Sequence, residues 1–178
     1  MPARVLVIGG QRSGKSRYAE DLVLASKLAP VYLATGAAGD GEMAERIARH
    51  RERRGDGWRT VEEPLDLGAA ILREASAGTA VLVDCLTLWL SNLLDAERPV
   101  DLDTERLVAA LGGVRGPVVI VSNEVGSGII PANALARTYA DALGSLNQRV
   151  AAAVDTVVLV AAGVPLVLKP TPANEVKL

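Results

Sequence analysis

The stretch of sequence that decides the fold is Gly9-Gly10-Gln11-Arg12-Ser13-Gly14-Lys15-Ser16. It fits G-x-x-x-x-G-K-[ST], the pattern of a phosphate-binding loop (P-loop) between a strand and a helix. The sequence predicts both the strand and the helix, because a β-branched run begins at Arg4 and a helical pattern continues to about Leu28. In that setting backbone N–H groups and the helix N-terminus bind phosphate, Lys15 reaches the outer phosphates and Ser16 binds Mg²⁺. A glycine-rich turn without a ligand is the alternative interpretation.

The rest of the chain repeats the alternation of strand and helix patterns. Short β-branched apolar runs are separated by longer helix-patterned segments, which is typical of an α/β fold with a mostly parallel sheet and helices on both faces. The expected strands are 4–8, 31–35, 58–61, 79–84, 118–122, 156–160 and 166–168. The expected helices are 15–28, 42–54, 65–74, 86–94, 107–114 and 132–154. A turn at 36–41 and a flexible loop at 96–103 are also expected.

Length and composition favour one globular domain. The 178 residues are 49% hydrophobic and 22% charged, which is enough to bury a core. We therefore expect residues 1–178 to form a single P-loop nucleotide-binding catalytic domain, with a loose tail at 170–178. The formal charge is −2, with 19 basic residues scattered among 21 acidic ones, which argues against binding nucleic acid or an anionic membrane. The expected partners are small molecules.

Three further features predict a cytoplasmic protein. No signal-peptide pattern precedes the first strand, and the longest apolar stretch, Val157 to Leu168, is too short and too interrupted to cross a membrane. The single cysteine, Cys85, has no partner for an internal disulfide, which agrees with a reducing compartment. A lone cysteine in an apolar run is expected to be a small buried hydrophobic residue.

A carboxylate is expected beside the P-loop. P-loop enzymes place one at the end of a neighbouring buried strand, where it holds the water shell of Mg²⁺ or orients the nucleophile. Asp84 ends the apolar run that begins at Thr79 and fits this role. An aspartate in that place is also a common helix N-cap, and the two roles do not exclude each other.

The only histidine of the chain, His50, lies in the expected helix 42–54. At helical spacing it shares a stripe with Met43 and Ile47, next to a face that carries several arginines. A half-buried histidine beside arginines is well placed to meet phosphates. Position alone leaves open a packed or surface histidine and a solvated arginine face.

A second loop, 122–131, follows a buried strand and reads Ser122-Asn123-Glu124-Val125-Gly126-Ser127-Gly128-Ile129-Ile130-Pro131. Because it opens at the carboxyl edge of a parallel sheet, its polar groups and glycines suggest contact with substrate. A plain turn followed by a helix cap is the alternative. Farther along, four polar side chains face either a ligand or solvent: Arg137, Asn147, Gln148 and Arg149.

An ordered set of motifs resembles one enzyme family, the bifunctional adenosylcobinamide kinase and adenosylcobinamide-phosphate guanylyltransferase of cobalamin biosynthesis. The resemblance runs over nearly the whole chain. Its markers are Gly9 to Arg17, Tyr32-Leu33-Ala34-Thr35, Glu42-Met43-Ala44 with Arg46-Ile47 and His50, Trp58-Arg59-Thr60 with Glu62, Asp84-Cys85-Leu86-Thr87, Asn92-Leu93-Leu94, Asn123 to Pro131 and Asn147-Gln148-Arg149. Many P-loop proteins share the first marker, whereas the ordered set is hard to obtain otherwise.

The resemblance implies a RecA-like P-loop domain that uses ATP or GTP with Mg²⁺. Such a protein phosphorylates the aminopropanol hydroxyl of adenosylcobinamide and then attaches GMP from GTP, giving adenosylcobinamide-GDP. The resemblance also implies that His50 takes the guanylyl group covalently and that the chain forms a homotrimer. The expected catalytic residues are His50 and Lys15, and the expected Mg²⁺ ligands are Ser16 and Asp84. The implied nucleotide contacts are Gly9, Gly10, Gln11, Arg12, Ser13, Gly14, Lys15, Ser16, Ala34, Thr35, Gly36, Arg51, Glu52, Arg53, Arg54, Glu62 and Asp84.

Two other functions stay open from the residues alone. In a single-activity P-loop metabolite kinase, His50 would be a structural residue. A GTP-binding regulatory protein is disfavoured, because Asp84 does not begin a D-x-x-G motif and no Asn-Lys-x-Asp base-reading motif occurs.

Overall fold

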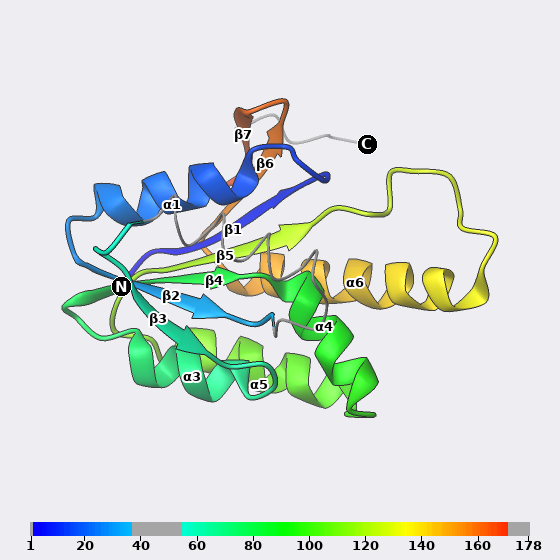
Figure 1. Cartoon of the computed structure of the whole chain (residues 1–178), viewed down its shortest axis with the longest axis horizontal. Coiled ribbons are helices and arrows are strands. Elements are labelled where there is room, and N and C mark those ends of the chain that lie inside the picture. Colours follow the sequence, from blue (N-terminus) through cyan, green and yellow to red (C-terminus); the bar gives the residue numbers. More distant parts are fainter. Residues whose placement is uncertain (1, 37–54, 171–178) are drawn as a thin grey trace, which may run out of the picture.

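A computed structural model describes residues 2–36 and 55–170 as one sheet covered by helices (Figure 1). The seven strands of the sheet run in the order β3-β2-β4-β5-β1-β6-β7. They are β1 (Arg4–Gly9), β2 (Ala29–Ala34), β3 (Arg59–Glu62), β4 (Thr79–Asp84), β5 (Val118–Asn123), β6 (Thr156–Ala161) and β7 (Val164–Lys169). The helices of the described residues are α1 (Lys15–Ala25), α3 (Leu67–Glu74), α4 (Leu86–Asp95), α5 (Val100–Gly112) and α6 (Ala134–Ala153).

All strands but β7 run parallel, and β7 pairs antiparallel with β6. β5 lies between β1 and β4, so that Gly9 pairs with Asn123, and Asp84 pairs with Val121. Because parallel strands end at the same edge, the P-loop, Asp84 and the loop after β5 all lie at the carboxyl edge of the sheet. The prediction of a mostly parallel α/β sheet is confirmed.

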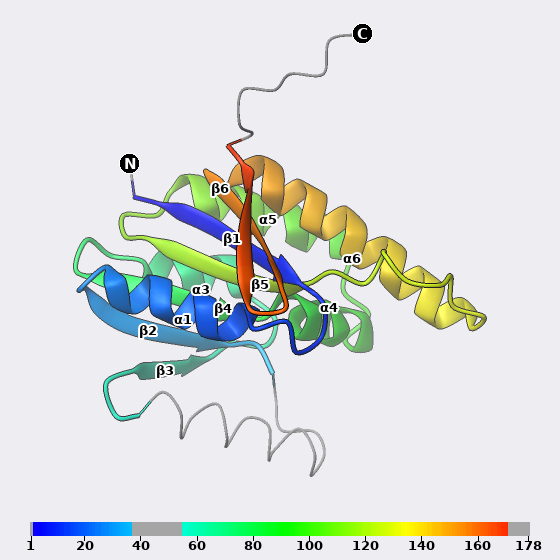
Figure 2. The ribbon, with the colours of Figure 1, turned by 90° about the horizontal axis from the view of Figure 1, so that it is seen from above.

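Each face of the sheet has its own core, because successive strand side chains point to opposite faces. In β1, Leu6 belongs to the cluster under α3, α4, α5 and α6, whereas Val7 belongs to the cluster under α1. Figure 1 shows α1 above the sheet with α3 and α5 below it, and Figure 2 shows α1 lying over the strands. The prediction of helices on both faces is therefore confirmed.

One predicted loop is wrong. Residues 96–103 were expected to form a flexible loop and the following helix to begin at Leu107, but α5 begins at Val100. Pro99 is the N-cap residue, and proline is tolerated at a helix start because the first N–H groups have no partner within the helix. Asp101 and Asp103 lie in the first turn, where the helix dipole favours negative charge. Pro99 thus marks the start of a helix instead of a break.

The other predicted elements agree with the structure within a few residues wherever it describes them. The helix 42–54, the turn 36–41 beyond Gly36 and the tail 170–178 beyond Pro170 lie outside the described residues. Among the described helices, none is long and apolar enough to cross a membrane.

Candidate active site

β1 delivers the P-loop directly to the first turn of α1. Gly9 is the last residue of β1 and Lys15 is the first of α1. Just before the helix, Gly14 has a φ of 96°, a left-handed conformation that strains any residue with a Cβ. Lys15 is only 6% exposed, and its Nζ donates a hydrogen bond to Gly10 O at 3.1 Å. The lysine ammonium group therefore lies against the loop that the sequence predicts to bind phosphate.

The turn between β6 and β7 packs against the P-loop. Gly163 N donates to Ser13 O at 2.8 Å. A Cβ on Gly9 would lie 2.4 Å from Val160 O, so β6 leaves no room for a side chain at that position. A cavity of about 580 Å³ opens between the P-loop, the β6–β7 hairpin and the loop after β5. Its lining includes Gly10, Arg12, Ser13, Glu124 and Ala161.

Asp84 lies at the end of β4, half-buried, two strands away from the P-loop strand. Tyr32 in β2 donates its hydroxyl hydrogen to Asp84 Oδ2 at 2.5 Å. The N-cap residue of α4 is Cys85, and no side chain caps that helix end. The alternative that Asp84 serves as a helix cap therefore has no support in this geometry.

Thr35 joins the ends of β2 and β4. Its hydroxyl donates to Cys85 O at 2.8 Å and accepts from Cys85 N at 2.9 Å, while its own N–H donates to Asp84 O at 3.2 Å. Thr35 is fully buried. Its hydroxyl is thus used within the protein, and the position of Thr35 fixes Asp84 relative to the neighbouring residues Ala34 and Gly36.

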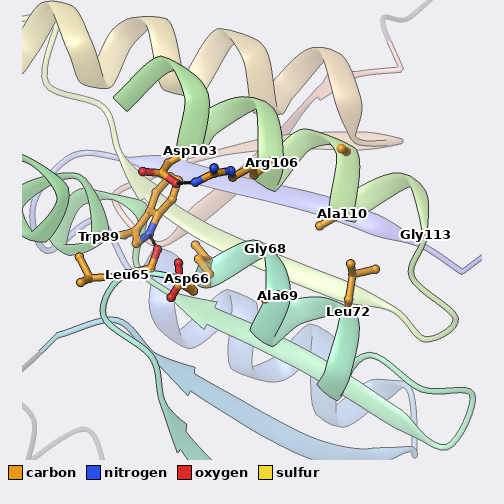
Figure 3. Close-up of a pocket in the computed structure, with 12 residues that line it drawn as sticks. Leu65, Asp66, Gly68, Ala69, Leu72, Trp89, Asp103, Arg106, Ala110 and Gly113 are labelled. Carbon is orange, nitrogen blue, oxygen red and sulfur yellow. Dashed lines mark hydrogen bonds and ion pairs between the residues drawn. The ribbon is translucent and has the colours of Figure 1, made fainter. Parts of the chain in front are cut away.

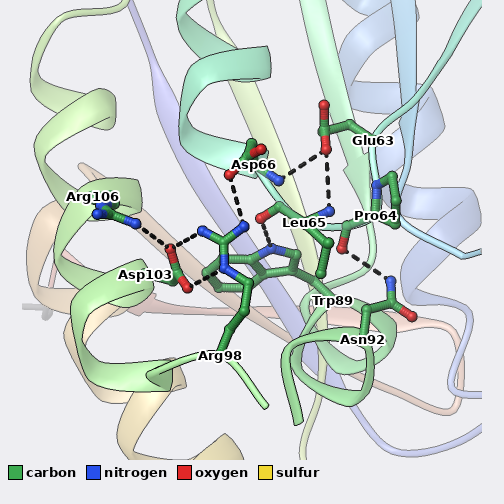
Figure 4. A network of polar contacts seen from close by, with 9 residues as sticks. All are labelled: Glu63, Pro64, Leu65, Asp66, Trp89, Asn92, Arg98, Asp103 and Arg106. Carbon is green, nitrogen blue, oxygen red and sulfur yellow. Dashed lines mark hydrogen bonds and ion pairs between the residues drawn. The ribbon is translucent and has the colours of Figure 1, made fainter. Parts of the chain in front are cut away.

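Two side chains of α4 hold the segments that leave β2 and β3. Figure 4 shows their contacts with Pro64 and Leu65, which follow β3. Asn92 Nδ2 donates to Thr35 O at 2.6 Å and to Pro64 O at 3.1 Å. Trp89 Nε1 donates to Leu65 O at 2.8 Å. The ends of β2, β3 and β4 are therefore fixed together at one part of the carboxyl edge.

The predicted nucleotide contacts fall into two groups. One group lies along the carboxyl edge of the sheet and consists of the P-loop residues together with Ala34 to Gly36, Glu62 and Asp84. Within it, Ala34 pairs with both Glu62 and Asp84. The predicted catalytic His50 and the stretch Arg51-Glu52-Arg53-Arg54 lie outside the described residues. The structure thus places the predicted phosphate and metal residues along the same edge of the sheet, on strands separated by β5. The role of His50 stays a prediction.

The loop after β5 begins with a tight local arrangement. Glu124 accepts hydrogen bonds from Gly126 N at 2.7 Å and Ser127 N at 3.3 Å, and its own N–H donates to Gly9 O at 3.1 Å. Asn147 Nδ2 donates to Asn123 O at 3.0 Å. The loop is consequently tied to the P-loop strand on one side and to α6 on the other.

Both arginines whose surroundings the sequence leaves open have partners within the protein. Arg137 donates to Pro131 O and Ala132 O at 2.8 and 2.7 Å, and Arg149 forms an ion pair with Asp101 at 3.3 Å. Both side chains therefore have structural roles close to α6.

Cys85 is buried, as the sequence predicts. Burial, with the nearby Asp84 charge as a smaller cause, raises the pKa of its thiol to about 11. At neutral pH the thiol is therefore protonated, and only the thiolate is a strong nucleophile. Cys85 packs in the core and has no features of a catalytic nucleophile.

A second cavity, of about 600 Å³, lies between α3 and α5 (Figure 3). At its polar end the buried Asp103 pairs with Arg98 at 2.6 Å and with Arg106 at 3.0 Å. Leu72 and Ala110 lie at its apolar end (Figure 3). None of the predicted site residues that the structure describes lines this groove, so it is separate from the candidate active site.

Sequence reasoning assigned no role to Tyr32 or Asn92, although both belong to the motifs that carry the family resemblance. A tyrosine two residues before the end of a buried parallel strand was the available signal, since its side chain shares a face with the strand end. Its partner Asp84 depends on the pairing of β2 with β4, which local patterns do not reveal.

Comparison with known proteins identifies the family. Residues 5–168 match the family described as cobinamide kinase / cobinamide phosphate guanyltransferase. The chain belongs to this family. The bifunctional adenosylcobalamin biosynthesis protein CobP of Pseudomonas aeruginosa is 52% identical over 171 residues, covering 95% of this chain and 99% of the relative. The corresponding CobU protein of Salmonella typhimurium is 40% identical over 180 residues, covering 93% and 99%. The prediction of a transferase of this family is confirmed.

Two solved structures share the fold. The RadB recombinase superposes with a TM-score of 0.52 at 16% identity, covering 88% of this chain and 73% of that protein. A prototypical ATPase from the type III secretion system of pathogenic bacteria gives a TM-score of 0.54 at 12% identity, covering 88% and 50%. At such identities the likeness bears on the fold alone, and it confirms the prediction of a RecA-like P-loop domain.

Proposed function

We propose that this protein phosphorylates adenosylcobinamide with ATP or GTP and then converts the product to adenosylcobinamide-GDP with GTP. The observation that carries the proposal is a P-loop with its lysine held in place, in a chain whose family is described by both activities. The partners are small molecules, and we place the reaction in the cytoplasm.

The kinase step rests on groups at the carboxyl edge of the sheet. The P-loop N–H groups and Lys15 bind the phosphates, and the lysine charge stabilises negative charge that develops during transfer. Ser16, next to Lys15 in α1, and Asp84 would hold Mg²⁺. Asp84 fits this task because the described residues donate to its Oδ2 only, through Tyr32. Held there, Mg²⁺ would supply positive charge that offsets the negative charge of the phosphates.

The guanylyl step would use His50 as a nucleophile. A neutral imidazole nitrogen attacks the α-phosphorus of GTP, forming a P–N bond while the bond to pyrophosphate breaks. A phosphate oxygen of adenosylcobinamide phosphate then attacks the same phosphorus, the P–N bond breaks and the imidazole is released. One difficult displacement is thereby divided into two easier ones.

Labelling with GTP that carries a radioactive α-phosphate tests this step. A phosphoramidate is lost in mild acid and survives alkali, so the wild-type protein should carry acid-labile, base-stable label. His50→Asn should abolish the label and guanylyl transfer, because asparagine has no nucleophilic ring nitrogen, whereas the kinase step should persist as an internal control. Label of that stability in His50→Asn would show that another residue carries the guanylyl group. A wild-type protein that never becomes labelled would favour the single-activity kinase.

We also propose that the chain forms a homotrimer. Two apolar surfaces support assembly: Ile129 and Ile130 after β5 are 98% and 79% exposed, and Leu166 and Val167 on the edge strand β7 are also exposed. Exposed apolar patches often mark contacts between proteins. Sedimentation equilibrium should give three times the mass of the chain, and a monomer at micromolar concentration would contradict the proposal.

A further inference from the structure

A hydrogen bond joins Tyr32 to Asp84 at the candidate metal site. β2 and β4 are parallel neighbours, in which Tyr32 pairs with Leu82 and Ala34 pairs with Asp84. Alternating side chains place Tyr32 and Asp84 on the same face of the sheet, one diagonal apart. The long phenol spans that diagonal, and its hydroxyl donates to Asp84 Oδ2 at 2.5 Å.

The ring that carries this hydroxyl is held by its surroundings. Tyr32 is 7% exposed and belongs to the core under α1, with Ala19 and Leu82 among its members. Trp58 packs edge-on against it, with ring centroids 6.3 Å apart and planes at 84°. A packed aromatic ring with few rotatable bonds fixes its hydroxyl with little freedom. The direction of the donated hydrogen bond is therefore set by the core.

A hydrogen bond from a hydroxyl to a carboxylate is among the stronger kinds in proteins. Here it occupies one oxygen of Asp84 and restricts the rotation of the carboxylate. The second oxygen, Oδ1, accepts no hydrogen bond from the side chains that the structure describes. The hydrogen bond from Tyr32 thus fixes the orientation of the carboxylate that would hold Mg²⁺.

We propose that Tyr32 is the positioning residue for Asp84 in the binding of the metal–nucleotide complex. This inference rests on the proposed role of Asp84 at Mg²⁺. Groups that orient metal-binding carboxylates typically contribute about 10- to 100-fold in metal affinity. Tyr32→Phe keeps the aromatic ring that packs in the core and removes the oxygen that donates to Asp84 Oδ2.

The decisive measurement is Mn²⁺ binding in the presence of a non-hydrolysable nucleoside triphosphate, followed by electron paramagnetic resonance. Tyr32→Phe should weaken Mn²⁺ binding by about 10-fold, in line with other carboxylate-orienting groups. Binding of the metal-free nucleotide should stay unchanged, because Lys15 and the P-loop are intact. Tyr139→Phe is the matched control, since it removes a phenol hydroxyl that donates to Thr87 O at 2.8 Å, and its Mn²⁺ affinity should equal that of the wild type.

A double-mutant comparison separates this inference from the proposed function. Asp84→Asn should weaken Mn²⁺ binding, and adding Tyr32→Phe to it should produce no further loss, because the two residues act as one unit. Wild-type Mn²⁺ affinity in Tyr32→Phe, with a loss in Asp84→Asn, would overturn the role of Tyr32 alone. Wild-type affinity in Asp84→Asn would overturn the metal role of Asp84 and this inference with it. The His50 labelling result is independent of both outcomes.

Discussion

The two faces of the sheet differ in the size of their apolar clusters and in whether buried polar groups lie at the candidate active site. The face under α3, α4, α5 and α6, which we call the leucine-rich face, buries a large apolar cluster that includes Leu90, Leu107 and Leu143. The face under α1 buries a smaller apolar cluster, and buried polar groups lie next to this cluster. Among them, Tyr32 meets Asp84, and Lys15 is buried at the start of α1.

This difference indicates that the two faces of the sheet contribute differently to stability and to chemistry. An apolar core stabilises the fold through the area that it removes from water, and it presents no polar atom to a reactant. Buried hydrogen-bonded polar groups give less net stability, but they fix directions, which a phosphate site requires. Substitutions on the leucine-rich face should therefore change stability and spare the chemistry, and those beside α1 should do the reverse.

The largest effect on stability is expected from Leu107→Ala. Leu107 in α5 is fully buried, and truncation of such a leucine typically costs about 2–5 kcal/mol of unfolding free energy. Urea unfolding measures the loss. Nucleotide affinity, measured at a temperature where the variant is folded, should match the wild type. A tenfold loss of nucleotide affinity in the folded variant would show that the two faces are coupled.

The largest effect on chemistry is expected from Lys15→Ala. Kinase turnover should fall by about 10²-fold or more, because the charge opposite the transferred phosphoryl group is lost. Lys27→Asn is a suitable control: it removes a lysine beyond the far end of α1, where φ is 59° and asparagine is well tolerated. Steady-state kinetics and circular dichroism would check both variants. Near-normal turnover in Lys15→Ala would end the P-loop interpretation.

A smaller effect, on stability, is expected from Gly9→Ala. The new Cβ would lie 2.4 Å from Val160 O and 2.6 Å from Ser13 Oγ, so β6 and the P-loop must move apart. Overpacking of this kind costs about 1–3 kcal/mol. Gly10→Ala is the matched control, because no atom lies within 4 Å of its added Cβ. Thermal melting should therefore show a drop for Gly9→Ala only; equal melting temperatures for the two variants would disprove the close contact with β6.

The smallest effect is expected from Asp155→Asn, at the edge of the sheet opposite the site. The hydrogen bond from Arg4, at 2.6 Å, holds the pKa of Asp155 below its ordinary value. A lowered pKa adds stability above the unfolded-state pKa, near 4, and that stability is lost as the pH falls through the folded-state pKa. Because the Asp155 side chain is 46% exposed, the cost at pH 7 should be below about 1 kcal/mol.

Urea unfolding at pH 7 and pH 3 measures this difference. The gap between wild type and Asp155→Asn should shrink at the lower pH, and kinase turnover should be equal at pH 7. A gap that grows on acidification would contradict the assigned direction of the pKa shift.

Local patterns in the sequence were sufficient for the strands, for the loop between β1 and α1 and for the position of Asp84 at the end of β4. Each of these depends on neighbouring residues only, such as the apolar run from Thr79 that ends in Asp84. The start of α5 at Val100 was missed because Pro99 was interpreted as a loop signal, although proline also suits a helix start.

Contacts between distant segments could not be predicted in the same way. The bond between Tyr32 and Asp84 joins residues 52 positions apart and exists because β2 pairs with β4. The contact of Gly163 with Ser13 requires the β6–β7 hairpin to lie beside the P-loop. Both depend on the order of strands in the sheet, which hydrophobic periodicity does not determine.

The buried position of Lys15 has a thermodynamic consequence for nucleotide affinity. Immobilising a lysine side chain costs about 2 kcal/mol of rotamer entropy. In this protein, folding has already ordered the side chain, through its burial and its bond to Gly10 O. An arriving triphosphate therefore meets a preorganised cation, and its binding is not weakened by that entropy loss.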